Sequence, residues 1–143
     1  MATYYFDTSV LVKRYISESG SVEVDRLFRE GSIFTSVLTY AEIFSTFYRL
    51  HREGFLDAKQ LKTQVLAFER DWQAIHVLEL TFDVLTLIPE LFKRYALRGA
   101  DGVHLATALF LEEKEIEMKF IASDLRLIQA AKQSGLRIIN PTV

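Results

Sequence analysis

The chain opens with a short apolar run that ends in three polar residues, Thr3-Tyr4-Tyr5-Phe6-Asp7-Thr8-Ser9. Aromatic residues favour strands, whereas Asp, Thr and Ser commonly cap helices. The stretch therefore predicts a strand over 3–6 that gives way at Asp7 to a helix over 8–15. An acidic residue at the point where a strand meets a helix recurs further along the chain.

The same alternation of short strands and longer helices continues to residue 139. We expect further strands at 32–35, 75–80, 119–122 and 137–139, and helices at 22–31, 36–52, 57–72, 83–97, 102–113 and 125–134. Pro89 falls inside one of these helices, which it should bend or break. Alternating strands and helices indicate an α/β protein with a central, mostly parallel sheet covered by helices on both faces.

Composition limits the class of protein. With 143 residues, half of them hydrophobic, the chain should form one domain over 1–143 with a substantial core. Its net charge of −2 gives no general basic surface, and the lack of cysteine excludes disulfides and cysteine-type zinc sites. No uncharged run approaches the roughly 18 residues of a membrane span. We therefore expect a cytoplasmic protein without a membrane segment.

Four carboxylates stand where the predicted strands end or on the helices just after them: Asp7, Glu42, Asp101 and Asp124. In parallel sheets ligands bind beyond the carboxyl ends of the strands. Like charges gathered there repel unless a cation or a shared proton neutralises them, and an oxygen-only cluster favours Mg²⁺ or Mn²⁺. The alternative for each aspartate is a helix cap, which is worth about 1 kcal/mol.

Glu42 is harder to explain as a surface residue, because its helical face also carries Leu38 and Ala41 lies beside it. No basic residue lies three or four positions away, so the usual helical salt bridge is missing. A lone glutamate buried on this face would cost several kcal/mol or be held protonated. A metal site would account for it.

Four strings carry a resemblance to a known family: FDTS at 6–9, TYAEI at 39–43, GADGVHLATA at 99–108 and FIASDLRL at 120–127. Together they resemble the PIN domain, and within that superfamily the VapC-type toxins of toxin–antitoxin pairs. The resemblance covers essentially the whole chain. It implies a three-layer α/β/α sandwich and an Mg²⁺- or Mn²⁺-dependent endoribonuclease.

The resemblance also implies roles for individual residues. Asp7 and Asp101 would hold the metal, with Glu42 and Asp124 acting through water or on a second ion. Ser9 would hydrogen-bond a carboxylate or a metal-bound water. The chain has Ala122 where the family often has threonine, and Asp124 is the member expected to lie farthest from the metal.

Partners follow from the same resemblance and from the aromatic residues concentrated in the helices over 36–52 and 57–72. These residues are Tyr40, Phe44, Phe47, Tyr48, Phe55, Phe68 and Trp72. One interpretation is a core together with a homodimer face. The other, implied by the family, is a groove for an antitoxin segment that reaches an arginine toward the acidic site.

Several alternatives stay open from sequence. His104, one helical turn after Asp101, is either a ligand or general base, or a packed and hydrogen-bonded histidine, which its apolar neighbours favour. The basic residues near the motifs either contact phosphates or are ordinary solvated side chains; they are Lys13, Arg14, Arg98 and Arg126. Besides a toxin ribonuclease, the chain could be an RNA-processing PIN nuclease or a non-catalytic scaffold that binds RNA or a partner.

Overall fold

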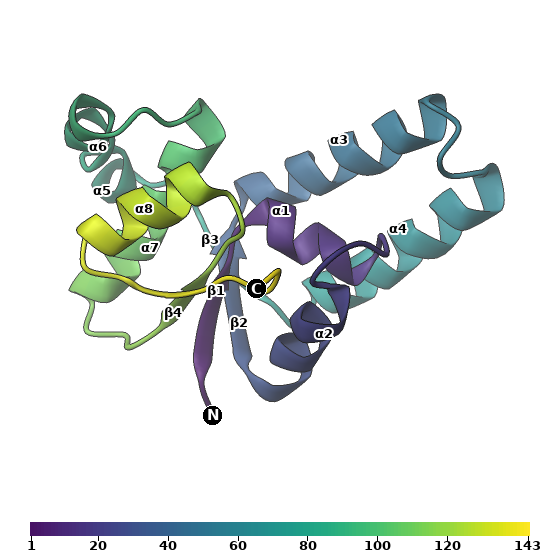
Figure 1. The fold of residues 1–143 in the computed structure, drawn as a ribbon, viewed down its shortest axis with the longest axis horizontal. Helices are drawn as coiled ribbons and strands as arrows, with labels where there is room; N and C mark the ends of the chain where they lie inside the picture. The colour runs from purple at the N-terminus through teal and green to yellow at the C-terminus, as the bar shows by residue number, and fades with distance from the viewer.

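A parallel sheet forms the centre of the molecule (Figure 1). It has five strands in the order β3-β2-β1-β4-β5. The computed structural model describes all residues from 1 to 143. The strands are β1 (Thr3–Phe6), β2 (Ser32–Ser36), β3 (His76–Leu78), β4 (Lys119–Ile121) and β5 (Arg137–Ile139). Tyr5 of β1 pairs with Phe34 on one side and with Phe120 on the other. The parallel sheet expected from the alternating pattern is thereby confirmed.

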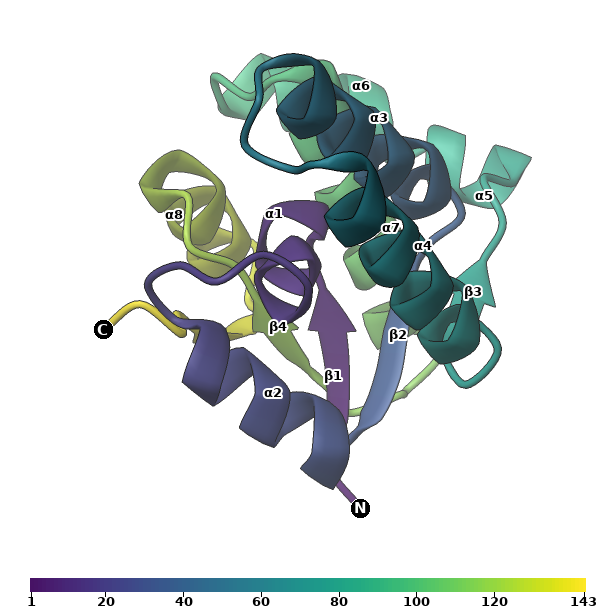
Figure 2. The same ribbon diagram turned by 90° about the vertical axis from the view of Figure 1, so that its right-hand side faces the viewer.

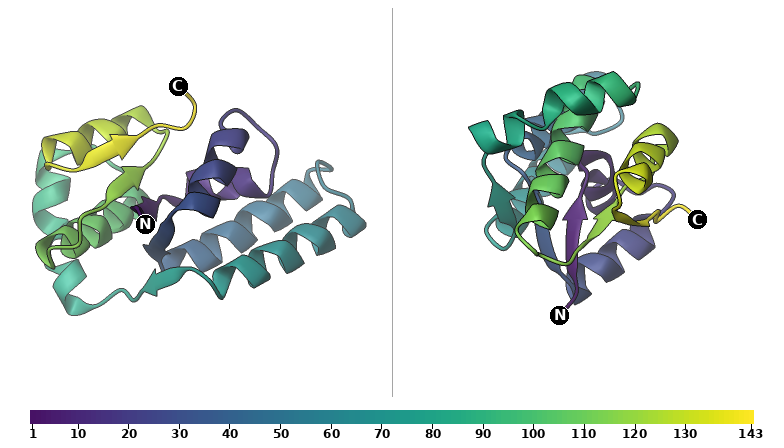
Figure 3. Two further views of the ribbon diagram at one scale, coloured as in Figure 1. Left: turned by 90° about the horizontal axis from the view of Figure 1, so that it is seen from below. Right: turned by 90° about the vertical axis from the view of Figure 1, so that its left-hand side faces the viewer.

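Helices cover both faces of this sheet, as Figures 2 and 3 show. The first group contains α1 (Thr8–Leu11), the 3₁₀ helix η1 (Val12–Arg14), α2 (Ser21–Glu30), α3 (Leu38–Arg52) and α4 (Ala58–Trp72). The second contains α5 (Phe82–Leu85), α6 (Ile88–Arg94), α7 (Gly99–Glu113) and α8 (Leu125–Gln133). Alternate residues of β1 enter different cores, Phe6 with the first group and Tyr5 with the second. The three-layer α/β/α prediction is therefore correct.

The strand order reverses direction between β1 and β4. From β1 the chain proceeds through β2 to β3 on one side, and then crosses to β4 and β5 on the other. Such a switch point opens a crevice at the carboxyl ends of the two central strands. Asp7 directly follows β1 and Asp124 lies shortly after β4, so the fold brings these two residues to the same crevice.

Two predicted helices are broken. The helix expected over 83–97 divides into α5 and α6, and Pro89 lies in the first turn of α6, where its missing N–H is not needed. The helix expected over 8–15 tightens into η1 after Leu11. There Arg14 Nε and the Tyr15 hydroxyl each donate a hydrogen bond of 2.8 Å to Asp71 Oδ2 of α4. This buried contact ties the first helices to the α3–α4 pair.

Helices α3 and α4 form a long antiparallel pair that projects beyond the sheet (Figure 1). The hydrophobic contact between them centres on Phe47 and Phe68, which are fully buried. Asp57 begins α4 with a capping box, since its side chain accepts from the Gln60 N–H and the Gln60 side chain accepts from the Asp57 N–H. None of the helices combines the length and apolarity that crossing a membrane requires.

Candidate acidic active site

Asp7 lies at the bottom of the crevice with 3% of its surface exposed. It occupies the N-cap position of α1, yet its side chain makes no capping hydrogen bond. Instead the Ser9 hydroxyl donates to Asp7 Oδ2 at 2.5 Å, and His104 Nε2 lies 3.8 Å from Asp7 Oδ1. The cap interpretation of Asp7 is therefore wrong, and its carboxylate is held for contacts in the crevice.

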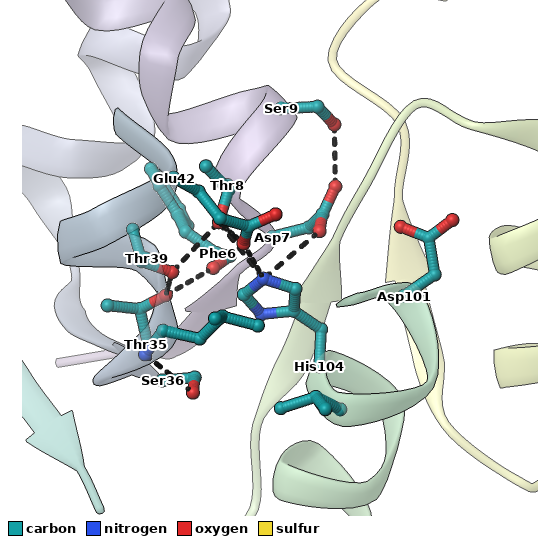
Figure 4. A network of polar contacts seen from close by, with 12 residues as sticks. Phe6, Asp7, Thr8, Ser9, Thr35, Ser36, Thr39, Glu42, Asp101 and His104 are labelled. Atoms are coloured by element: carbon teal, nitrogen blue, oxygen red, sulfur yellow. Dashed lines mark hydrogen bonds and ion pairs between the residues drawn. The ribbon is translucent and has the colours of Figure 1, made fainter. Parts of the chain in front are cut away.

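Glu42 reaches the same crevice from α3, and one of its oxygens is fixed from two sides. Thr8 Oγ1 donates to Glu42 Oε1 at 2.7 Å, and His104 Nε2 donates to the same oxygen at 2.8 Å (Figure 4). Burial acts to raise the pKa of Glu42, but the hydrogen bonds from His104 and Thr8 outweigh burial and lower the pKa. Oε2 has no hydrogen-bond partner. The second oxygen of an ionised carboxylate is thus available to the cavity.

His104 connects Glu42 to the core of the protein. Only 1% of its surface is exposed, and its Nδ1 lies 2.9 Å from the hydroxyl of Tyr5, which is fully buried. Burial acts to lower the pKa of His104. The hydrogen bond to Glu42 and the charges of the nearby carboxylates outweigh burial, so the pKa of His104 is raised above its usual value. The packed, hydrogen-bonded interpretation of His104 is correct, because both ring nitrogens are engaged inside the protein.

A row of buried hydroxyls extends this network beneath the site. Thr8 Oγ1 lies 2.9 Å from Thr39 Oγ1, which lies 2.8 Å from Thr35 Oγ1. Thr35 in turn donates to the Phe6 carbonyl at 2.7 Å. These contacts join the end of β1, the end of β2 and the start of α3, so they fix where Asp7 and Glu42 stand relative to each other.

Asp101 faces these residues from the first turn of α7, across the cavity (Figure 4). Arg98, not Asp101, occupies the N-cap position, so the cap interpretation of Asp101 is wrong. Burial raises the pKa of Asp101, the charge of Asp7 raises it further, and Arg98 acts in the opposite direction. Two carboxylates that repel in this way mark a position where a cation would be stabilised.

Asp124 is the one aspartate whose cap interpretation is correct. Its Oδ1 accepts the Leu127 N–H at 3.0 Å and caps α8. Its other oxygen lies 3.7 Å from the Arg98 guanidinium, which is also 3.3 Å from Asp101 Oδ2. Arg98 has an 80% exposed side chain and therefore bridges two of the four carboxylates from the solvent side.

All four carboxylates line one open cavity of about 490 Å³, together with Thr8, Ser9 and Arg98. No three Asp, Glu or His side chains are close enough to enclose a metal ion as they stand. The chemistry of the donors nevertheless fits a hard divalent cation: every donor is an oxygen, Asp7 raises the pKa of Asp101, and a guanidinium already lies against Asp101 and Asp124.

Glu42 has no salt-bridge partner on its own helix, as expected, but it does not stand alone in the fold. Its partners come from distant segments: His104 lies 62 positions away and Thr8 lies 34 positions away. Tyr5, Thr35 and Thr39 were missed altogether, although hydroxyl groups at a strand end and on the helix that follows it are a recognisable signal. The catalytic roles of the four carboxylates and Ser9 stay predictions.

Comparisons with known proteins add to this geometry. A model of the PIN domain family matches residues 4–133. The curated proteins Ribonuclease VapC45 and Ribonuclease VapC49, both from Mycobacterium tuberculosis, are each 32% identical to this chain over 140 residues. The match covers 96% of this chain and 95% of each relative.

Solved structures show the same fold at low sequence identity. A toxin-antitoxin complex from Klebsiella pneumoniae is 16% identical with a TM-score of 0.66, and the match covers 96% of this chain and 97% of that one. VapC20 of Mycobacterium tuberculosis, described as a sarcin-ricin loop cleaving toxin, is 18% identical with a TM-score of 0.63. That match covers 93% of this chain and 95% of the other.

Proposed function

Because this chain belongs to the PIN domain family, we propose that it is a divalent-metal-dependent endoribonuclease and the toxin of a toxin–antitoxin pair. The observation that carries the proposal is the convergence of Asp7, Glu42, Asp101 and Asp124 on one cavity at the switch point of the sheet. Relatives named as ribonucleases, matched over nearly their whole length, support an RNA phosphodiester as the substrate.

In this proposal Asp7 and Asp101 bind Mg²⁺ or Mn²⁺. A divalent ion held there would neutralise the charge of the phosphate and lower the pKa of a water toward neutrality. Ser9 fixes one oxygen of Asp7, and Thr8 with His104 fixes Oε1 of Glu42. Glu42 Oε2 is then directed at the cavity, where it would orient the attacking water and take up its proton. Asp124 would act through water, since one of its oxygens caps α8.

Two other functions within the family are less well supported. An RNA-processing nuclease would use the same site without a toxin role. This alternative is less well supported because the ribonuclease relatives are named as VapC proteins. A non-catalytic scaffold would have no need for four carboxylates in one cavity, because their repulsion only destabilises a protein that binds no cation. We therefore favour the toxin ribonuclease.

The α3–α4 pair is the surface we assign to protein partners. Its aromatic side chains are not all used by the core: Tyr48 is 44% exposed and Phe55 is 72% exposed. We propose that this surface contacts a second copy of the chain and a cognate antitoxin. Structural neighbours solved as toxin–antitoxin complexes support the antitoxin. We also propose a cytoplasmic location, where RNA is present as a substrate.

Cleavage of RNA by purified variants tests the proposed function. The wild-type protein should cleave single-stranded RNA with Mg²⁺ or Mn²⁺ and stop when EDTA is added. Asp7→Asn and Asp101→Asn should each abolish cleavage. Asp57→Asn is the matched control, because asparagine caps a helix as well as aspartate does and Asp57 lies outside the cavity. Cleavage that survives in Asp101→Asn, or that is unaffected by EDTA, would contradict the assignment.

A further inference from the structure

The acidic cavity continues into a groove that leads away from the four carboxylates. A second cavity of about 570 Å³ shares Arg98, Asp101 and Asp124 with the first. A third, of about 430 Å³, shares Ala96, Leu97 and Arg126 with the second. The three form one path that follows the linker between α6 and α7 and then runs beside α8.

The charge along this path changes from negative to positive. The third cavity is lined by Arg94 and Arg126 and by no acidic residue. Arg126 is exposed and has no ion pair or hydrogen bond, and the contact between Arg94 and Glu90 is a long one of 4.0 Å between exposed side chains. Two guanidinium groups are thus free to bind an anion next to a cavity that we expect to bind a cation.

Arg98 stands where the acidic and basic parts of the path meet. Its guanidinium contacts Asp101 and Asp124 on one side, and its side chain lines the second cavity on the other. Arg98, Arg126 and Arg94 therefore follow one another along the path from the carboxylates outward. An anionic polymer whose phosphodiester lies at the carboxylates would place its next phosphates beside these arginines.

Apolar side chains lie between the arginines. Leu125 lines the second cavity with 75% of its surface exposed, Tyr95 lines the third and Leu97 lines both. A double helix offers only its backbone and groove edges to such a path, whereas an unpaired strand can also place its base faces on apolar and aromatic side chains. The mixture of charge and apolar surface suits an unpaired strand.

We propose that this groove binds the backbone of a single-stranded RNA segment that adjoins the cleaved bond, through Arg98, Arg126 and Arg94. The inference rests on the proposed ribonuclease function and assigns the path of its substrate. The groove would select unpaired RNA over duplex RNA and would contribute to substrate affinity without taking part in the chemistry.

Binding by an inactive protein tests the groove separately from cleavage. In an Asp7→Asn background, the variants Arg94→Gln, Arg126→Gln and both together are titrated against a short fluorescent single-stranded RNA at several salt concentrations, with anisotropy as the readout. Arg29→Gln is the matched control, because Arg29 is exposed, unpaired and on α2, outside the three cavities. Thermal melts of each variant check that the fold is intact.

We expect the double variant to bind RNA at least several-fold more weakly than the Asp7→Asn parent. The plot of the logarithm of the binding constant against the logarithm of the salt concentration should become shallower, by about 0.7 for each arginine removed. In the otherwise wild-type protein the same two substitutions should raise KM and leave kcat unchanged. Arg29→Gln should change neither quantity.

Unchanged affinity and salt slope in the double variant, with RNA still bound, would overturn the groove while leaving the ribonuclease proposal intact. Preference for a polyglutamate peptide over RNA in the same assay would also overturn it, in favour of an acidic protein partner. If the wild-type protein shows no metal-dependent cleavage, the proposed function is contradicted. The failure of the groove and the failure of the proposed function are therefore distinguishable.

Discussion

His104 provides a quantitative test of the network beneath the site through the substitution His104→Ala. The change removes a side chain that is almost fully buried and leaves the buried hydroxyl of Tyr5 without its partner. An unsatisfied buried polar group costs about 1–3 kcal/mol, and the cavity left behind adds to this cost. The loss of the hydrogen bond to Glu42 adds little to the cost, because Thr8 and solvent remain as partners of this carboxylate. We expect unfolding to require about 2–4 kcal/mol less than in the wild type.

The assay is urea denaturation monitored by circular dichroism. It is combined with a double-mutant cycle that includes Tyr5→Phe. In the Tyr5→Phe background no hydroxyl is left unpaired, so His104→Ala should cost about 1 kcal/mol less than it does in the wild type. In RNA cleavage, His104→Ala should lower kcat by about 10- to 100-fold, because Glu42 loses one of the two hydrogen bonds that orient it.

A loss of less than about 1 kcal/mol in His104→Ala would contradict the structural role of this imidazole, which is buried and hydrogen-bonded at both ring nitrogens. A cycle that is additive within about 0.5 kcal/mol would contradict the Tyr5–His104 contact, because that is the level expected of residues that do not interact. Undiminished cleavage would show that Glu42 needs no support from His104.

Substitutions at three further acidic residues separate their roles. Asp101→Asn should raise the free energy of unfolding at neutral pH, because the pKa of Asp101 is raised in the folded state and its ionised form therefore destabilises the fold. Urea titrations at several pH values check this. The gain should vanish as the pH falls below about 3.9, where the carboxyl group is protonated in both the folded and the unfolded state. Asp71→Ala should lower the free energy of unfolding by about 3 kcal/mol, measured by urea denaturation. It removes the acceptor of the buried Tyr15 hydroxyl and leaves the partly buried Arg14 with only the more exposed Asp25 as its carboxylate. Asp124→Ala should lose about 1 kcal/mol of stability together with cleavage, whereas Asp124→Asn should keep the cap and lose cleavage alone; melting curves and RNA cleavage of both variants check this.

The strands, the helices and the place of each carboxylate along them were predictable because each depends on local sequence. The run over 3–9 contains both a strand and the polar residues that end it, and the structure has that strand at Thr3–Phe6. Pro89 predicted a break within the helix expected over 83–97, but not that α6 would use it in its first turn. The order of strands then placed Asp7 and Asp124 at one crevice, as a parallel sheet requires.

The support for the carboxylates was not predictable, because it depends on packing between distant segments. The His104–Glu42 hydrogen bond exists only because α7 and α3 meet across the sheet edge, and no spacing along the chain encodes that meeting. Sequence likewise could not tell which aspartates act as caps, since all three stand near helix starts; only the hydrogen bond from Leu127 N–H distinguishes Asp124. The bridging position of Arg98 depends on the same tertiary contacts.

Metal binding to the acidic cavity is the most direct test of the account as a whole. Thermal and urea unfolding should be measured with and without Mn²⁺ for the wild type, for Asp7→Asn and for the control Asp57→Asn. At a metal concentration of about 100 times Kd, the wild type and the control should gain about 2.7 kcal/mol, and Asp7→Asn should gain nothing. An equal gain in Asp7→Asn, or no gain in the wild type at any Mn²⁺ or Mg²⁺ concentration, would contradict the claim that these four carboxylates form a metal site.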